Sequence, residues 1–124
     1  MAIVALLAFA EALPAAEDGF AAWWPQFKAA VAKGDLSAML KNAEFPMDWE
    51  LKQVRRIPSF DDFAAHFDAY FPSDMKKAVA TAKPVSIPGG QYMITWHARG
   101  NEYSLYFKKL RTKWALYALS EGPP

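Results

Sequence analysis

The order of hydrophobic patterns along the chain predicts an α+β fold, in which N-terminal helices pack on an antiparallel sheet. Over most of the chain up to Lys83, apolar residues recur at steps of three and four, the spacing of one helical face. After Lys83 the pattern changes to the two-residue alternation of strands. The last such segment, Trp114 to Ser120, is apolar on both faces, so both of its faces must be covered.

The first predicted helix runs from Asp18 to Lys33, and Asp18 is suited to cap its N-terminus. Pro25 lies inside this segment and should kink or restart the helix, because proline lacks a backbone donor. A short second helix is expected over Leu36–Asn42, with Asp35 as its cap.

The middle of the chain combines one strand pattern with two helical ones. Apolar and charged residues alternate within Met47–Ile57, which predicts an edge strand. Ser59–Asp62 resembles a capping box and predicts the start of an aromatic helix that reaches Phe71. Pro72 separates this helix from a further helical piece over Asp74–Lys83.

The C-terminal part predicts a meander of short strands joined by turns. The expected strands are Pro84–Ile87, Gln91–Arg99, Glu102–Lys109 and Trp114–Ser120. Gly100-Asn101 should close a tight hairpin, because glycine and asparagine tolerate the left-handed backbone of such turns.

Composition limits the possible classes of protein. A chain of 124 residues with 53% hydrophobic residues can build one well-filled core, and its formal charge of +1 gives no basic excess of the kind nucleic-acid binders show. No nucleic-acid partner is therefore expected. The absence of cysteine excludes disulfides, thiolate nucleophiles and cysteine metal sites.

The N-terminal sequence MAIVALLAFAEALPAA, residues 1–16, resembles a secretory signal peptide. An uninterrupted apolar run, Ala2–Ala10, precedes a proline and small residues, and it is too short to span a bilayer. No basic residue precedes the run, as expected if the basic start of the signal were truncated. The prediction is a periplasmic or secreted domain over residues 17–124. The alternative is a retained, buried first helix and a cytoplasmic protein.

Three segments resemble the NTF2-like (cystatin-like fold) superfamily, and within it small exported bacterial domains of unknown function. They are FAAWWPQFKAAVAKGDLSAML (Phe20–Leu40), the Phe45-Pro46 step, and YSLYFKKLRTKWALYALSEGPP (Tyr103–Pro124). The resemblance covers about Asp18–Gly122. It departs at Leu110–Lys113, where the turn before the tryptophan often holds Asp-Gly in the superfamily.

The resemblance implies a strongly curved sheet that wraps around the helices as a cone. In such folds the concave side often holds a pocket, and the convex side often forms a dimer interface. The superfamily includes isomerases, dehydratases, hydrolases and purely binding members, so the fold does not define the function.

The aromatic residues on the predicted inner faces, together with tyrosines of the last strands, are the candidates for lining such a pocket. They are Trp23, Trp24, Phe27, Phe63, Phe67, Trp96, Tyr106, Trp114 and Tyr117. The alternative is that most of these rings simply fill the core, because a small domain needs its aromatic area for stability.

Two histidines supply the candidates for acid–base catalysis. His97 can align with Glu102 or with Ser104 across the predicted hairpin, and His66 lies four residues after Asp62 on the aromatic helix. These pairs are also compatible with ordinary surface pairing. The acids and histidines show no recognised metal-ligand spacing, so neither a metal nor another cofactor is expected.

The sequence therefore predicts a small exported domain that binds a small apolar ligand or a peptide in an aromatic cone, without catalysing a reaction. The first alternative is a protein-interaction module, a homodimer formed through the sheet. The second is an NTF2-like isomerase, lyase or hydrolase. No stable membrane span is predicted.

Overall fold

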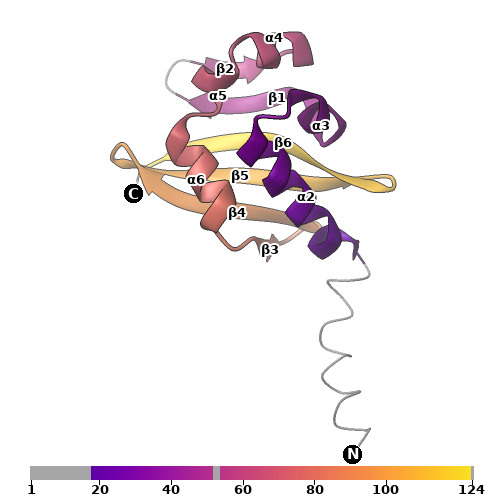
Figure 1. Cartoon of the computed structure of the whole chain (residues 1–124). Helices are drawn as coiled ribbons and strands as arrows, with labels where there is room; N and C mark the ends of the chain where they lie inside the picture. Colours follow the sequence, from indigo (N-terminus) through magenta and orange to yellow (C-terminus); the bar gives the residue numbers. More distant parts are fainter. Residues whose placement is uncertain (1–17, 52–53, 124) are drawn as a thin grey trace, which may run out of the picture.

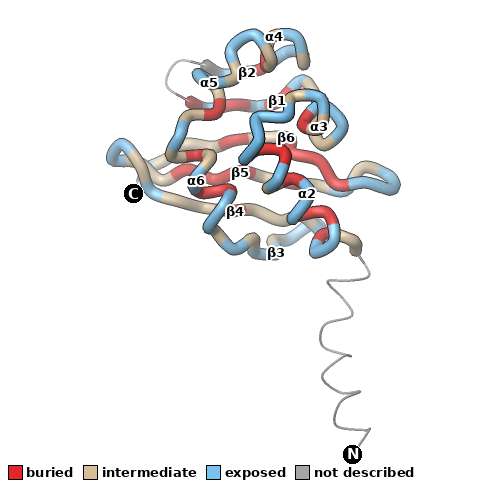
Figure 2. Tube along the Cα trace, viewed as in Figure 1, coloured by how far each residue is buried: buried red, intermediate tan, exposed pale blue. Residues whose placement is uncertain are grey.

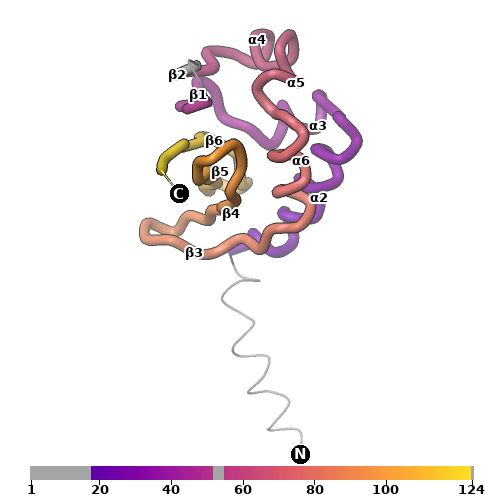
Figure 3. Tube along the Cα trace, turned by 90° about the vertical axis from the view of Figure 1, so that its left-hand side faces the viewer, coloured from indigo at the N-terminus to yellow at the C-terminus, as the bar shows by residue number. Residues whose placement is uncertain are grey.

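The computed structural model describes residues 18–51 and 54–123, and it shows helices packed on a strongly bent sheet (Figure 1). The predicted signal peptide, residues 1–16, lies outside the described residues. The α2 helix and the α6 helix lie across one face of the sheet, here called the inner face (Figures 1 and 3). None of the helices formed by the described residues lies on the opposite, outer face (Figures 1 and 3).

The helices follow the expected order along the chain. They are α2 (Phe20–Lys33), α3 (Leu36–Lys41), α4 (Phe60–Ala65), α5 (Phe67–Tyr70) and α6 (Ser73–Thr81). Gly34 ends α2 with a left-handed φ of 64°, and the Asp35 side chain accepts a 3.1 Å hydrogen bond from the Ala38 backbone N–H at the start of α3. The α2 helix runs through Pro25 without a break, so of the two predicted alternatives, a kink or a restart, the restart does not occur.

Six strands form one sheet in the order β2-β1-β6-β5-β4-β3. They are β1 (Ala43–Leu51), β2 (Val54–Ile57), β3 (Val85–Ile87), β4 (Gln91–Ala98), β5 (Asn101–Leu110) and β6 (Lys113–Gly122). All neighbouring pairs are antiparallel except β1 and β6, which are parallel. The α+β fold class predicted from the sequence, with helices packed on a curved and mostly antiparallel sheet, is thus confirmed.

The prediction of a single edge strand over Met47–Ile57 is wrong. The chain turns back within this segment, so β2 forms the edge and β1 lies between β2 and β6. Trp49 pairs with Leu119 of β6, and both side chains are fully buried. An inner position suits β1 because its alternate residues Met47, Trp49 and Leu51 supply an apolar face for the core.

The predicted aromatic helix is divided at His66 into α4 and α5. Ser59 caps α4 as expected, since its Oγ accepts a hydrogen bond of 3.2 Å from the Asp62 backbone N–H. Phe63 and Phe71, on either side of the break, are both buried. The break therefore allows the segment to bend over the core while both of these rings remain inside.

Two tight hairpins join the last three strands. Ala98 pairs with Asn101, so the turn residues are Arg99 and Gly100, both at positive φ, and the prediction of Gly100-Asn101 is displaced by one residue. Leu110 pairs with Lys113, which leaves a two-residue turn, Arg111-Thr112, and settles the length of this hairpin.

The core lies between α2 and the centre of the sheet, where the buried residues gather (Figure 2). Phe107 of β5 is fully buried and contacts four rings of α2, among them the tilted ring of Phe20 with centroids 6.1 Å apart. Its ring centroid lies 5.7 Å from that of Trp23, 5.3 Å from Trp24 and 5.5 Å from Phe27. These tilted and edge-on contacts are the favoured geometries of aromatic pairs.

Phe107→Ala should lower the free energy of unfolding by about 3–5 kcal/mol, because it removes the ring on which the α2 aromatics pack. Chemical denaturation followed by circular dichroism measures this loss. Leu40→Ala, at a residue that is 44% exposed, is the control and should change the same free energy by only about 0.5 kcal/mol. Equal stabilities of the two variants would contradict a core centred on Phe107.

Candidate functional site

The aromatic residues predicted to line a pocket divide into two groups. Seven of them lie on the inner side of the sheet or on the helices, where they contact other rings of the core. They are Trp23, Trp24, Phe27, Phe63, Phe67, Trp96 and Trp114. Trp96 stacks on Tyr103 with centroids 5.7 Å apart, and Phe63 meets Phe67 edge-on at 5.5 Å. This part of the cone is filled by its own side chains.

Hydrogen bonds hold several of these rings in place. The indole N–H groups of three predicted pocket residues donate to described partners: Trp23 to Asn42 Oδ1 at 2.7 Å, Trp96 to Asp74 Oδ2 at 3.0 Å, and Trp114 to the Asp18 carbonyl at 2.6 Å. Moving such a buried indole aside for a ligand would break its hydrogen bond, and the broken bond would cost free energy. The inner aromatics therefore act as fixed core residues.

The other two predicted pocket residues, Tyr106 and Tyr117, lie on the outer face of the sheet. Their ring centroids are 6.3 Å apart. The Tyr106 hydroxyl and the Ser120 hydroxyl are 3.0 Å apart, and the Tyr117 hydroxyl donates to Gln91 Oε1. Burial is the largest cause of a raised pKa for Tyr117, so this ring is already partly withdrawn from water.

The part of the outer face formed by β4, β5 and β6 is uncharged between its ends, and it is bordered by the exposed Asp48 of β1, which pairs with Ala118. Strand register places side chains of β4, β5 and β6 side by side there, and we call them the uncharged patch. The patch consists of Gln91, Met93, Thr95, Ser104, Tyr106, Tyr117, Ala118 and Ser120. Val85 of the edge strand β3 pairs with Met93 and extends the patch with a side chain that is 50% exposed.

Charged residues lie at both ends of this patch. At one end Lys108 Nζ is 2.7 Å from Glu44 Oε1, and the same ammonium lies 4.7 Å from the centroid of the Tyr117 ring. At the other end His97 Nε2 is 3.7 Å from Glu102 Oε2. The outer face therefore combines an uncharged centre with a rim of charged and titratable groups.

The register brings the candidate catalytic pair His97 and Glu102 directly opposite each other. Their side chains are 66% and 45% exposed, and they lie on the outer face, away from the inside of the cone. The second candidate pair, His66 Nδ1 and Asp62 Oδ1, is 3.5 Å apart on α4, with the histidine largely exposed. Both pairs therefore lie at the surface.

Asp62 has another partner that the sequence analysis did not identify. The Tyr70 hydroxyl donates a 2.6 Å hydrogen bond to Asp62 Oδ2, and this bond raises the pKa of Tyr70. It links the start of α4 to the end of α5 across the break at His66. A carboxylate engaged in this way stabilises the bend of the chain.

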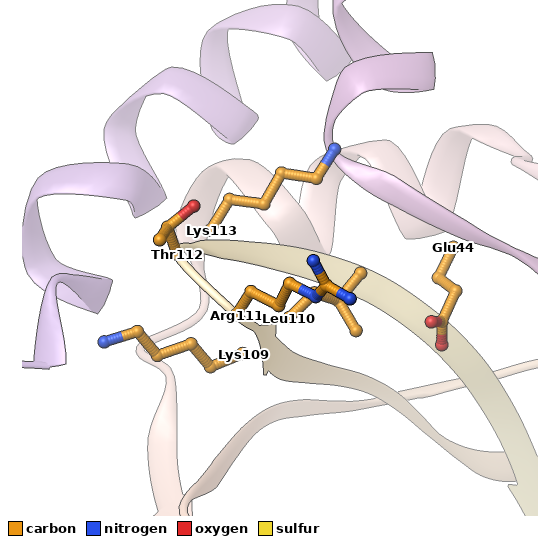
Figure 4. A pocket seen from close by; sticks show the side chains of 6 residues that line it. All are labelled: Glu44, Lys109, Leu110, Arg111, Thr112 and Lys113. Atoms are coloured by element: carbon orange, nitrogen blue, oxygen red, sulfur yellow. The ribbon is translucent and has the colours of Figure 1, made fainter.

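Described residues form several open hollows at the surface. The one in Figure 4 has a volume of about 500 Å³ and lies at the β5–β6 hairpin, lined by Glu44, Lys109, Leu110, Arg111, Thr112 and Lys113. The cationic side chains point in different directions around it, and Lys113 Nζ donates to the Lys41 carbonyl at 2.7 Å. They do not converge on a common point, as an anion site would require.

A second hollow, of about 350 Å³, is polar and lies where α6 approaches β4. Its lining includes the candidate residues Trp96 and His97, together with Asp74, Lys77 and Thr81. Both carboxylate oxygens of Asp74 are already engaged, one by the Trp96 indole and one by Arg99. Asp74 therefore holds this corner of the fold together.

A third hollow, of about 290 Å³, is apolar and lies between α2 and the start of the β3–β4 hairpin. It is lined by Phe20, Ala21, Trp24, Pro84 and Tyr92, and we call it the Trp24 slot. The rings of Phe20 and Tyr92 are stacked with centroids 3.9 Å apart and nearly parallel planes. Trp24 and Tyr92 are the members of this slot that the sequence indicates as candidates for a pocket or an interface.

Asp18 fixes the shape of the Trp24 slot. Its Oδ2 accepts a hydrogen bond of 2.6 Å from the Tyr92 hydroxyl, and its Oδ1 accepts one of 2.9 Å from the Phe20 backbone N–H. Asp18 and Tyr92 are 74 residues apart in the sequence, so only the folded chain reveals this contact.

The described residues, 18–51 and 54–123, hold no group of three or more histidine, cysteine or acidic residues placed to bind a metal ion. Within the same residues, no helix is both long and apolar enough to cross a membrane.

Comparison with protein-family models gives no match, and comparison with curated proteins gives none either. Two solved structures are similar to this chain. One is an NTF-2 like protein of unknown function from Shewanella oneidensis MR-1, 12% identical with a TM-score of 0.48, covering 86% of this chain and 97% of that one. The other is the designed protein Rd1NTF2_05, 13% identical with a TM-score of 0.45, covering 83% and 97%. Identities of this size define neither activity nor ligand nor partner.

Tyr92→Phe should change how stability depends on alkaline pH. The hydrogen bond to Asp18 raises the pKa of Tyr92 to about 12 from its ordinary value of 10.0, so the folded protein keeps the phenolic proton that the unfolded chain loses. The stability that this hydrogen bond contributes is fully present below pH 10 and is lost as the pH rises toward 12. The difference in unfolding free energy between wild type and Tyr92→Phe should therefore shrink over that window.

Urea unfolding at a series of pH values measures this difference directly. Lysine titration affects both proteins equally and cancels in the comparison. A difference that stays constant across the window would show that Asp18 does not hold the Tyr92 proton.

Proposed function

We propose that this domain is a non-catalytic protein-interaction module that forms a homodimer through the outer face of its sheet. The observation that carries this proposal is the uncharged patch, which has Tyr106 and Tyr117 at its centre and no helix over it. Tyrosine and methionine are enriched in protein interfaces, whereas lysine and acidic residues are depleted from their centres.

The filled interior favours a binding surface over a binding cavity. Trp23, Phe27 and Phe107 contact one another on the inner side, where a ligand in the cone would have to sit. Binding there would separate rings that now make close contacts, with a free-energy cost similar to that of opening the core. Association through the outer face requires no such rearrangement.

The charges at the ends of the patch suit a two-fold axis that lies between the two facing sheets, parallel to their planes and perpendicular to their strands. Such an axis exchanges the two ends of the patch, so the Lys108 end of one subunit faces the Glu102 end of the other. Opposite charges then meet at the rim while the uncharged centres pack together. The same arrangement buries Val85, whose exposed apolar side chain otherwise contacts water.

The catalytic alternative has weaker support than the proposed dimer. The pairs His97–Glu102 and His66–Asp62 lie at exposed positions, where water and counter-ions screen their interactions. A general base works best when burial tunes its pKa toward the working pH, and these histidines lack that burial.

Met93→Lys should raise the dissociation constant of the dimer by about tenfold or more, because it places a charge at the centre of a desolvated interface. Sedimentation velocity over a range of protein concentrations measures the effect. Ala80→Lys, at an exposed position of α6, adds the same charge on the helical side and should leave the dissociation constant unchanged. A wild-type protein that stays monomeric at high concentration would refute the dimer.

We also propose that residues 1–16 direct export, which places the dimer in the periplasm or outside the cell. The support is the apolar run followed by small residues in the sequence. When the gene is expressed in an exporting bacterium, intact mass spectrometry of the purified protein should show a chain that begins near Glu17. A purified chain that still begins at Met1 would indicate a retained segment and a cytoplasmic protein.

A further inference from the structure

One edge of the sheet is only partly covered, because β3 is much shorter than its neighbour β4 (Figure 1). The ladder between them ends where Val85 lies opposite Met93. Pro84 precedes Val85 and cannot continue the ladder, since proline has no backbone N–H. Residues 94–98 of β4 therefore pair with β5 on one side, and no strand of the described residues pairs with them on the other.

An open hollow follows this free part of the edge. It is the hollow of about 350 Å³ between α6 and β4, and both Trp96 and His97 line it. Trp96 belongs to the inner face, where its indole donates to Asp74 of α6, whereas His97 belongs to the outer face. Because neighbouring residues of a strand point to opposite sides of the sheet, a space that both of them line lies at the edge of β4.

The hollow has the form of a groove between a helix and a strand. The α6 residues that line it recur at steps of three and four, so they share one face of the helix, and they are Asp74, Lys77, Ala78 and Thr81. From the first to the last of them the helix rises by about 10 Å. A strand rises by about 3.3 Å per residue, so the groove has the length of about three residues of an extended chain.

We propose that this edge groove, formed by residues 94–98 of β4 and the lining face of α6, binds an extended peptide segment of a partner protein as an additional strand. In an antiparallel ladder, alternate residues direct their N–H and C=O groups away from the neighbouring strand. At the free part of β4 these groups face the groove, and an extended backbone supplies the matching donors and acceptors. The groove is separate from the outer face, so the inference does not depend on the proposed dimer.

The charges in the groove favour a segment with acidic side chains. Lys77 contributes an ammonium group to the lining. Asp74, the one carboxylate among the described lining residues, already binds Arg99 and the Trp96 indole. A strand in the groove presents every second side chain to the helical side, so a carboxylate of the partner can lie beside Lys77.

The same charge disfavours a second copy of this chain as the occupant. Antiparallel pairing of two β4 edges requires a two-fold axis perpendicular to the joined sheet, which keeps both α6 helices on the same side. Lys77 of each copy would then line one shared groove, and like charges brought together in this way repel. An acidic segment of another protein has no such conflict.

Titration of the isotope-labelled full chain, followed by two-dimensional amide NMR, tests the proposal. The probe is a blocked hexapeptide of alternating valine and glutamate, and the control is the same peptide with N-methyl groups on successive residues, which removes its backbone donors. We expect saturable shifts of the amide signals of residues 94–98 and Lys77 with the probe, and none with the control. Absence of these shifts with the probe, or equal shifts with the control, would overturn the proposal.

Two neighbouring lysines of α6 provide a matched pair of variants. Lys77 lines the groove, whereas Lys76 does not and lies 3.2 Å from Asp68. Lys77→Gln should weaken binding of the valine–glutamate peptide by about three- to fivefold, as expected for the loss of one exposed ion pair. Lys76→Gln should leave the dissociation constant within about twofold of wild type.

Three further outcomes would contradict the proposed occupant. Equal effects of the two lysine variants would show that the peptide does not lie beside Lys77. Equal binding of a valine–lysine peptide would show that the groove does not select acidic side chains. Shifts of the same β4 amides that grow with protein concentration, without any peptide, would show that a second copy covers the edge.

Discussion

The packing of Phe107 against the aromatic face of α2 is the contact on which the rest of the structure depends. Phe107 projects from the middle of β5 into the space that the curved sheet encloses, where Trp23, Trp24 and Phe27 surround it. In a domain of this size, stability requires that most large rings be buried together. The same rings that could have lined a cavity therefore pack against one another in the core.

The inner and outer faces of the sheet carry different kinds of side chain. On the inner face, alternate residues are large and apolar, and helices cover them. On the outer face, Tyr106, Tyr117 and Ser120 combine apolar bodies with hydroxyl groups that bond to one another or to a neighbouring amide. Such a face is tolerated in water, since its polar tips are hydrogen-bonded, and it can still bury apolar area against a partner.

Asp18, at the other end of the core, also connects segments that are far apart in the sequence. One carboxylate accepts hydrogen bonds from the Phe20 backbone and the Tyr92 hydroxyl, while the carbonyl of the same residue accepts the Trp114 indole N–H. The first described residue thereby connects α2 to two strands of the sheet. This connection shapes the slot beside Trp24.

The sequence by itself determined the class of fold, most element positions and local features such as the Asp35 cap, because these depend on neighbours a few residues away. It also placed His97 where it could meet Glu102, since a hairpin limits register to a few choices. Only the tertiary structure decided that β1 runs parallel to β6, that the aromatic cone is filled, and that Asp18 reaches Tyr92. Each of these depends on volume and contact between distant segments, which no local pattern encodes.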